Sequence, residues 1–409
     1  MRFRRDFLKP GAILAGMMFC GACTPMSGGR ASLKPLRPPA VPLVAVDPFF
    51  SVWSAADRLT DRETTHWSGA KQPLSVTVSL GGRTYRLCGA EPADIPALPQ
   101  TSCEVRPLTT VCTFANAEAD VEVRFMTPAL PDDLDVFSRP VTYLAVRARD
   151  RNGAPLDARV ACGVTPAWAT NDDTARMVTN RTTVAGHPAL SIGRADQRPL
   201  GKAGDAVRCD WGYVWLVGPV VRDGETHFLL AYDDVKSVQW FDRALDAWWR
   251  RGGKTFPAML AEAERDYPAL TAKADAADAA LAKDFRRVGG EKYARLASLV
   301  WRQSFAACKL VAGPDAQPLY LSKENGSGGF IGTVDVFYPQ MPHLLLTSLP
   351  LVKGTLEPVL LYASTTNWPH AYAPHDLGLY PRATGQEYRM AAKFDDTHRM
   401  PVEECGNML

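Results

Sequence analysis

Apolar and polar residues alternate along the part of the chain that runs from Ala31 to about Tyr232. Apolar residues take every second position in Leu74–Val78, a glycine pair follows at Gly81–Gly82, and Tyr85–Leu87 resumes the pattern. Val121–Phe125 alternates in the same way. Alternation with period two predicts strands with one buried face, and a glycine pair between two such runs predicts a hairpin.

Two further hairpins are expected from paired apolar runs. Val141–Val146 and Val160–Cys162 flank the turn dipeptide Asn152–Gly153, and Tyr213–Val221 is followed by His227–Ala231. Prolines and glycines separate these runs from one another. Many short strands at this spacing predict a β-sandwich.

The pattern changes near Lys236, where proline becomes sparse and alanine frequent. Apolar residues now recur at steps of three and four, which places them on one face of a helix. They are Leu270, Ala274, Ala277, Leu281, Phe285 and Val288. Gly289–Gly290 is expected to end this helix, because glycine adopts the left-handed cap conformation without strain.

A second helix is expected to follow, with Trp301 and Arg302 in packing and surface positions beside its buried stripe. The expected stripe consists of Tyr293, Leu296, Val300, Ala307 and Leu310.

The first thirty residues have the pattern of an export signal. Arg4–Lys9 is similar to the twin-arginine motif, and a short apolar run follows at Gly11–Cys20. Gly21–Cys23 also has the form of a lipoprotein signal. We expect a protein of the periplasm or cell envelope that meets a membrane only through this signal or through a lipid on Cys23.

These patterns predict a multidomain β + α protein, since 409 residues are more than one core usually holds. The expected parts are a signal at 1–30, a β-sandwich at 31–235, a helical linker at 236–290 and the start of a helical domain at 291–409.

Charge and cysteine spacing narrow the possible functions. The formal net charge is +2 and no long basic block is present, so we expect no nucleic-acid partner. The cysteines beyond the signal are scattered and form no C-x-x-C pair, which argues against a zinc site and allows one or two disulfides. We expect neither a metal nor another cofactor.

Polar groups that suit catalysis concentrate in three segments of the second half. These are Ser322–Asp335, which contains a glycine-rich stretch, Trp368–Pro381, and Glu403–Glu404 near the end. Two carboxylates, or a carboxylate and a histidine, that face one pocket can divide acid and base roles.

Structural roles compete with these catalytic ones. The glycines can form a surface turn, Asp335 among apolar neighbours can cap the adjacent backbone, and His375 with Asp376 can brace a loop. Adjacent Glu403 and Glu404 point about 100° apart on a helix, so at most one is expected to face a site.

The same segments, with others in one order from about residue 35 onward, resemble the glutaminase A family of exported bacterial and fungal proteins. The strongest matches are Ser322–Asn325, Ile331–Val336, Tyr338–Pro339, Ala373–Asp376 and Met400–Met408. The resemblance implies a β-sandwich region joined to a six-hairpin α/α toroid akin to that of many glycosidases. It also implies hydrolysis of L-glutamine to glutamate and ammonia.

Similar sequences usually continue for several helical hairpins past Met400–Met408, so the resemblance implies that this chain holds only the beginning of the toroid. An unclosed toroid leaves apolar helix faces without partners, at about 25 cal/mol per Å². We therefore expect the 409-residue chain by itself to be inactive and poorly folded beyond Val288.

Three functions stay open. The first is an envelope amidohydrolase for glutamine or a similar small amide, in which Asp335, Glu403 or Glu404 is the general base and His375 or Lys323 steadies the developing charge. The second is a glycosidase with paired carboxylates. The third is a glycan-binding protein without turnover, with Trp53, Trp67 or Trp368 as a platform.

For the site as a whole, the candidate catalytic residues are Asp335, His375, Asp376, Glu403 and Glu404. The candidate binding residues for a glutamine or carbohydrate substrate are Trp67, Lys323, Glu324, Asn325, Tyr338 and Trp368.

Overall fold

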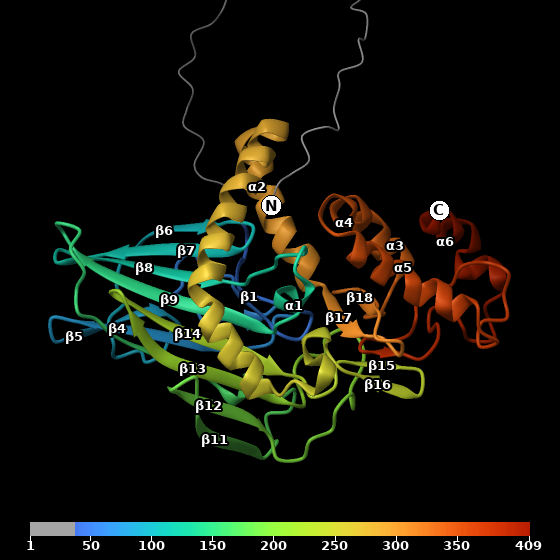
Figure 1. The fold of residues 1–409 in the computed structure, drawn as a ribbon, viewed down its shortest axis with the longest axis horizontal. Coiled ribbons are helices and arrows are strands. Elements are labelled where there is room, and N and C mark those ends of the chain that lie inside the picture. Colours follow the sequence, from blue (N-terminus) through green and yellow to red (C-terminus); the bar gives the residue numbers. More distant parts are fainter. Residues whose placement is uncertain (1–36) are drawn as a thin grey trace, which may run out of the picture. The chain divides into compact units, whose positions relative to one another are not determined.

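An eight-stranded antiparallel sheet forms the centre of the first half (Figure 1). Its strands in order are β11 (Met177–Val184), β12 (His187–Arg194), β13 (Tyr213–Arg222), β14 (Glu225–Asp233), β9 (Val141–Asp150), β8 (Ala119–Met126), β7 (Thr109–Ala115) and β6 (Gln100–Val105). The computed structural model describes residues 37–409, and the export signal expected at 1–30 lies outside them.

Two small sheets accompany the large one. They are β10 (Arg159–Val164), β4 (Leu74–Leu80) and β5 (Arg83–Cys88), and then β1 (Val41–Ala45), β2 (Ser51–Ser54) and β3 (Thr65–His66). Val76 and Val78 of β4 share one buried cluster with Val123 of β8 and Leu230 of β14. The predicted sandwich of packed sheets is therefore confirmed.

Two of the three predicted hairpins are confirmed, and the third is wrong. β4 and β5 pair around Gly81–Gly82, and β13 pairs with β14. β9 and β10 do not pair, because β8 and β14 already occupy both edges of β9. The chain turns after β9 and crosses to the other sheet, where β10 pairs with β4.

A long helical segment, α2 (Phe256–Ala306), covers the opposite face of the large sheet (Figure 1). Tyr267 and Leu270 of α2 share a buried cluster with Tyr143 of β9 and Leu229 of β14. The predicted helix end occurs at Gly290, whose φ of 72° and ψ of −170° break α2 into two arms.

The stripe expected on the second arm of α2 is wrong. Tyr293, Leu296 and Val300 are 45%, 54% and 48% exposed, and Leu310 lies in a strand. The arm buries the neighbouring face instead, which consists of Ala294, Ser298, Trp301, Arg302, Phe305 and Ala306. Apolar residues occupy two adjacent faces of this arm, so their spacing alone does not identify the buried one.

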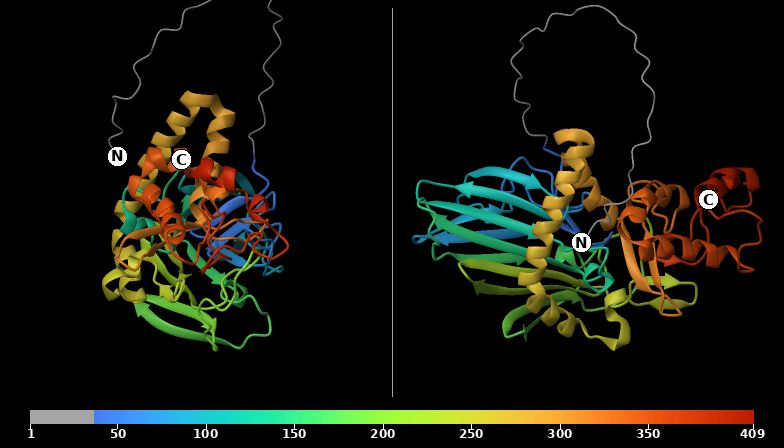
Figure 2. Two further views of the ribbon diagram at one scale, coloured as in Figure 1. Left: turned by 90° about the vertical axis from the view of Figure 1, so that its right-hand side faces the viewer. Right: turned by 45° about the horizontal axis from the view of Figure 1, so that its top comes forward.

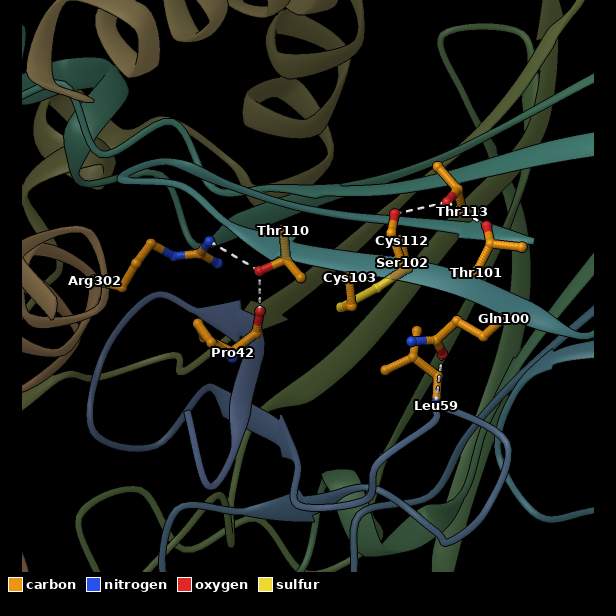
Figure 3. Close-up of a disulfide and its surroundings, with 10 residues drawn as sticks. All are labelled: Pro42, Leu59, Gln100, Thr101, Ser102, Cys103, Thr110, Cys112, Thr113 and Arg302. Atoms are coloured by element: carbon orange, nitrogen blue, oxygen red, sulfur yellow. Dashed lines mark hydrogen bonds between the residues drawn. A yellow bond between two sulfur atoms is a disulfide. The ribbon is translucent and has the colours of Figure 1, made fainter. Parts of the chain in front are cut away.

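Arg302 is buried and not at the surface (Figure 3). Its Nη1 donates to Oγ1 of Thr110 on β7 at 3.3 Å, and Thr110 Oγ1 donates to the carbonyl of Pro42 at 2.6 Å. Nearby, a disulfide joins Cys103 of β6 to Cys112 of β7. The spacing of the cysteines allowed a disulfide without identifying this pair.

Short elements complete the second half. The range 236–290, expected to be a helical linker, holds β15 (Val238–Trp240), β16 (Arg243–Leu245) and η2 (Trp248–Gly253) before α2, while the domain boundaries stay predictions. The elements after α2 are β17 (Cys308–Ala312), β18 (Pro318–Ser322), α3 (Val334–Phe337), η3 (Tyr338–Gln340), α4 (Met341–Thr347), α5 (Leu349–Ala363), β19 (Arg382–Ala383), η4 (Asp396–Arg399) and α6 (Pro401–Met408). Two other short helices, α1 (Leu134–Phe137) and η1 (Pro166–Trp168), lie in the first half.

The strand-rich first half and the helical second half confirm the predicted fold class. None of the helices within residues 37–409 combines the length and the apolar composition that crossing a bilayer requires. All but three of the exposed large apolar side chains in the described range lie at or after Val288. Apolar surface is therefore covered well in the first half and less well in the second.

Candidate active site

Two loops of the second half are joined by backbone hydrogen bonds. The amide of Ile331 donates to the carbonyl of Gly378, and the amide of Val334 donates to the carbonyl of His375, both at 2.9 Å. The second bond places His375 beside the first turn of α3, which carries Asp335. Helix α6, which carries Glu404, packs against α3. The segments that carry these residues lie together at one side of the sheets (Figure 2).

Asp335, His375 and Glu404 come together in one cluster. A carboxylate oxygen of Asp335, a ring nitrogen of His375 and a carboxylate oxygen of Glu404 all lie within 4.8 Å of one another. Nε2 of His375 is 4.0 Å from Oδ1 of Asp335. Glu404 is 0% and His375 is 4% exposed, whereas the Asp335 side chain is 32% exposed. Solvent therefore reaches the cluster at Asp335.

One oxygen of each carboxylate in this cluster lacks a hydrogen-bond donor. Oδ1 of Asp335 and Oε1 of Glu404 are buried and have no hydrogen-bond partner among the described residues. Asn407 donates to the other oxygen of Glu404 at 3.5 Å. Burial raises the pKa of Glu404 to about 7, with His375 opposing the shift and Asp335 adding to it. Buried oxygen atoms without donors are costly, so a ligand or a proton is expected there.

Asp376 hydrogen-bonds to His375 on the side of the imidazole ring that faces away from Asp335 and Glu404. Nδ1 of His375 lies 3.0 Å from Oδ2 of Asp376, which is fully buried, and the imidazole stacks on Tyr388 at 4.0 Å. Burial alone would lower the pKa of His375, but Asp376, Glu404 and Asp335 together raise it. Because Asp376 accepts at Nδ1, Nε2 is the ring nitrogen that faces the cluster.

Lys323 and Trp67 form a second group of polar and aromatic residues together with Asp205. Nζ of Lys323 is 4.9 Å from the centre of the Trp67 ring and donates to Oδ1 of Asp205 at 3.3 Å. Burial lowers the pKa of Lys323 to about 8, and Asp205 opposes the shift. The ammonium group of Lys323 thus forms its ion pair with Asp205 and does not pair with the carboxylates of the cluster.

Glu324 lies at the rim of the cluster and is partly buried. Burial raises its pKa, the amide of Gly328 and the charge of His375 oppose the shift, and the charge of Asp335 adds to it. Oε1 accepts from the Gly328 amide at 3.1 Å, and Oε2 accepts from Thr333 at 3.5 Å. Glu324 therefore adds a fourth carboxylate to the surroundings of His375, after Asp335, Asp376 and Glu404.

Four candidate residues do not reach the cluster. Glu403 and Asn325 are exposed, and Tyr338 is 51% exposed. Trp368 is 3% exposed and donates through Nε1 to the Tyr372 carbonyl at 2.6 Å, which is a packing role. Of the two adjacent glutamates, only Glu404 contributes to the cluster.

Two residues that contact candidate site residues were not predicted from the sequence. Asp205 lies in the long loop between β12 and β13, and it also accepts from the amide of Gly326 at 2.8 Å. Tyr388 stacks on His375 from a segment without regular structure. Neither residue lies in a periodic pattern or a motif, so only the three-dimensional structure identifies them.

The fold and the cluster define a protein in which a β-sheet region precedes a helical domain with a histidine–carboxylate site. Residues 290–409 match the model of the glutaminase A six helical-hairpin domain. Residues 108–224 and 217–284 match one domain of unknown function, DUF5127, and residues 17–99 match another, DUF4964. These matches, with the relatives below, support the resemblance to the glutaminase A-like family that the motifs predicted.

Two curated relatives carry glutaminase names. Glutaminase A of Aspergillus oryzae is 27% identical over 447 residues, which cover 94% of this chain and 64% of that protein. A probable glutaminase of Arthroderma benhamiae is 35% identical over 130 residues, which cover 32% of this chain and 14% of that protein. The chain thus spans less than two thirds of the length of either relative.

Proposed function

We propose that the protein is an exported amide hydrolase of the glutaminase type that converts L-glutamine to glutamate and ammonia. The family and the names of the two relatives support the reaction class. The observation that carries the proposal is the cluster of Asp335, His375 and Glu404, whose buried carboxylate oxygens lack donors.

In this proposal the cluster binds and activates a water molecule. The water loses a proton to a carboxylate, and its oxygen attacks the side-chain amide carbon of glutamine. His375 steadies the negative charge that develops on the amide oxygen. The carbon–nitrogen bond then breaks, the proton passes to the leaving nitrogen, and ammonia departs. Asp376 positions His375 and does not touch the substrate.

The test is ammonia release from L-glutamine by the protein encoded by the complete reading frame. Asp335→Asn and Glu404→Gln should each lower kcat by roughly 100-fold or more, because each removes a carboxylate that acts on the water. Glu403→Gln is the matched control on α6 and should keep full activity. Folded Asp335→Asn and Glu404→Gln variants with full activity would place the site elsewhere.

A glycosidase is the second candidate, and the carboxylate spacing favours it. Oxygens of Asp335 and Glu404 lie within 4.8 Å of one another, and retaining glycosidases hold their carboxyl groups about 5 Å apart. Release of sugar from aryl glycosides without ammonia release would select this function. Sugar binding without either product would indicate a glycan-binding protein.

A further inference from the structure

We propose that Asp335, His375 and Glu404 together bind one divalent transition-metal cation, with Zn²⁺ and Mn²⁺ as the best-fitting probes. The inference deepens the proposed function and rests on it for its catalytic meaning, because a bound cation would polarise the water that the cluster activates and would take over from His375 the stabilisation of the charge on the amide oxygen. As a binding site it stands on geometry alone.

The first argument is the spacing of the three donor atoms. Because the atoms lie within 4.8 Å of one another, some point lies no more than about 2.8 Å from all three (4.8 Å divided by √3), close to the 2.0–2.6 Å of metal–ligand bonds. Small side-chain rotations close the remaining gap. The solvent-exposed edge at Asp335 leaves a coordination position open to water or substrate, as a catalytic site requires.

The second argument is the state of Glu404. The Glu404 side chain is fully buried, and its Oε1 has no hydrogen-bond partner among the described residues. Glu404 contributes one carboxylate oxygen to the three-atom group. Asp335 Oδ1 is unpartnered as well. Two carboxylates of like charge at this distance repel each other, and Lys323 is held by Asp205. A cation between the two carboxylates removes the repulsion and supplies the missing partner.

The third argument is the arrangement behind the histidine. A metal-binding histidine usually donates its other ring N–H to a carboxylate or carbonyl, which fixes the tautomer and the ring direction. His375 does this through Nδ1 to Asp376, whose Oδ1 accepts from the amides of Gly378 at 2.8 Å and Glu387 at 3.0 Å. Nε2 then presents a lone pair to the cluster. One imidazole among carboxylates favours a transition metal over Ca²⁺ or Mg²⁺.

The test measures metal binding directly. The protein from the complete reading frame is stripped with a chelator and titrated with Zn²⁺, Mn²⁺ and Ca²⁺ by calorimetry, with metal content read by mass spectrometry. One equivalent of Zn²⁺ or Mn²⁺ should bind, and Ca²⁺ should bind more weakly. Glu404→Gln and Asp335→Asn should each weaken binding at least 10-fold, while Glu403→Gln should leave it unchanged. Asp335 is partly exposed, so its variant serves if Glu404→Gln does not fold.

The outcomes separate the two proposals. Absence of stoichiometric binding, or equal binding by the wild type and both variants, would overturn the metal site. Ammonia release that persists in chelated protein would overturn the catalytic role of the cation and leave the proposed function standing. Stoichiometric binding that depends on Glu404, in a protein that releases no ammonia from glutamine, would uphold the metal site and overturn the proposed function.

Discussion

Asp376 accepts a hydrogen bond from Nδ1 of His375 at 3.0 Å while the backbone amides of Gly378, Glu387 and Tyr388 donate to the same carboxylate. The carboxylate is therefore fixed by its own loop before it fixes the imidazole. This arrangement assigns Asp376 a positioning role, although the adjacent pair in the sequence suggests either catalysis or loop bracing.

The first prediction concerns this pair. Asp376→Asn replaces an acceptor by an amide and removes the preference for a proton on Nδ1 of His375, so ammonia release should fall by roughly 10- to 100-fold. The loss should appear in kcat more than in KM, because Asp376 does not touch the substrate. The matched control is Asp396→Asn, which removes an exposed partner of His370 at 3.4 Å and should have no effect. An Asp376→Asn variant that folds with unchanged kcat would contradict the positioning role.

The second prediction concerns a buried charge cluster. Nζ of Lys309 lies 2.7 Å from Oδ2 of Asp47 and 2.8 Å from Oδ2 of Asp234, and all three side chains are buried. Burial opposes the charge on Lys309, but the two aspartates raise its pKa. Lys309→Met leaves two buried carboxylates without their cation, so the free energy of unfolding should drop by about 3–5 kcal/mol.

Chemical denaturation at neutral pH measures this effect. The control is Lys236→Met, which breaks a partly exposed pair with Asp246 and should change stability by less than about 1 kcal/mol. If Lys309→Met lowers the free energy of unfolding no more than the control does, the charge cluster contributes little to the packing of β17 against the N-terminal segment.

Sequence patterns predicted the strands well, because one buried face imposes period two on each of them. The strand partners were harder to infer. Val141–Val146 and Val160–Cys162 flank a good turn dipeptide, yet the edges of β9 are taken by β8 and β14. A turn dipeptide indicates that the chain reverses locally, but it does not indicate which strand edge is free to pair.

The sequence identified the three segments that carry the candidate site, but not which of their residues lie together. Asp335, His375 and Glu404 come from three segments of the sequence, and the structure brings them within 4.8 Å. Glu404 is buried and Glu403 is exposed. Because both residues are glutamates in adjacent positions, the sequence does not show which of them is buried. Asp205 was beyond prediction, because its role depends on a loop of the β region that reaches Lys323.

The third prediction concerns the uneven covering of apolar surface. Leu346, Leu349 and Leu360 in and near α4 and α5 are 79%, 62% and 58% exposed, whereas Leu229 and Leu230 of β14 are fully buried. Burial contributes about 25 cal/mol per Å², so the helices after Val288 should open at lower free energy than the large sheet. Hydrogen exchange on the 409-residue chain should show faster exchange in α4 and α5 than in β9 and β14. Equal protection of both regions would contradict it.

The fourth prediction concerns the acid stability of the fold. His66 is 1% exposed, its Nε2 lies 3.0 Å from the Pro48 carbonyl, and burial lowers its pKa from 6.5 to about 3. Between these pH values the unfolded chain binds a proton that the folded chain does not. The stability that depends on neutral His66 is therefore present above pH 6.5 and is lost as the pH falls toward 3.

Denaturation between pH 7 and pH 4 should show a decline on the order of a few kcal/mol. Burial also lowers the pKa of His343 to about 4, so His343 contributes to the same slope. His66→Gln removes one titrating group and should make the decline shallower, although it lowers stability at pH 7. The control is His398→Gln at an exposed position, which should leave the slope unchanged. A His66→Gln protein with the wild-type slope would mean that His66 gains its proton without loss of the fold.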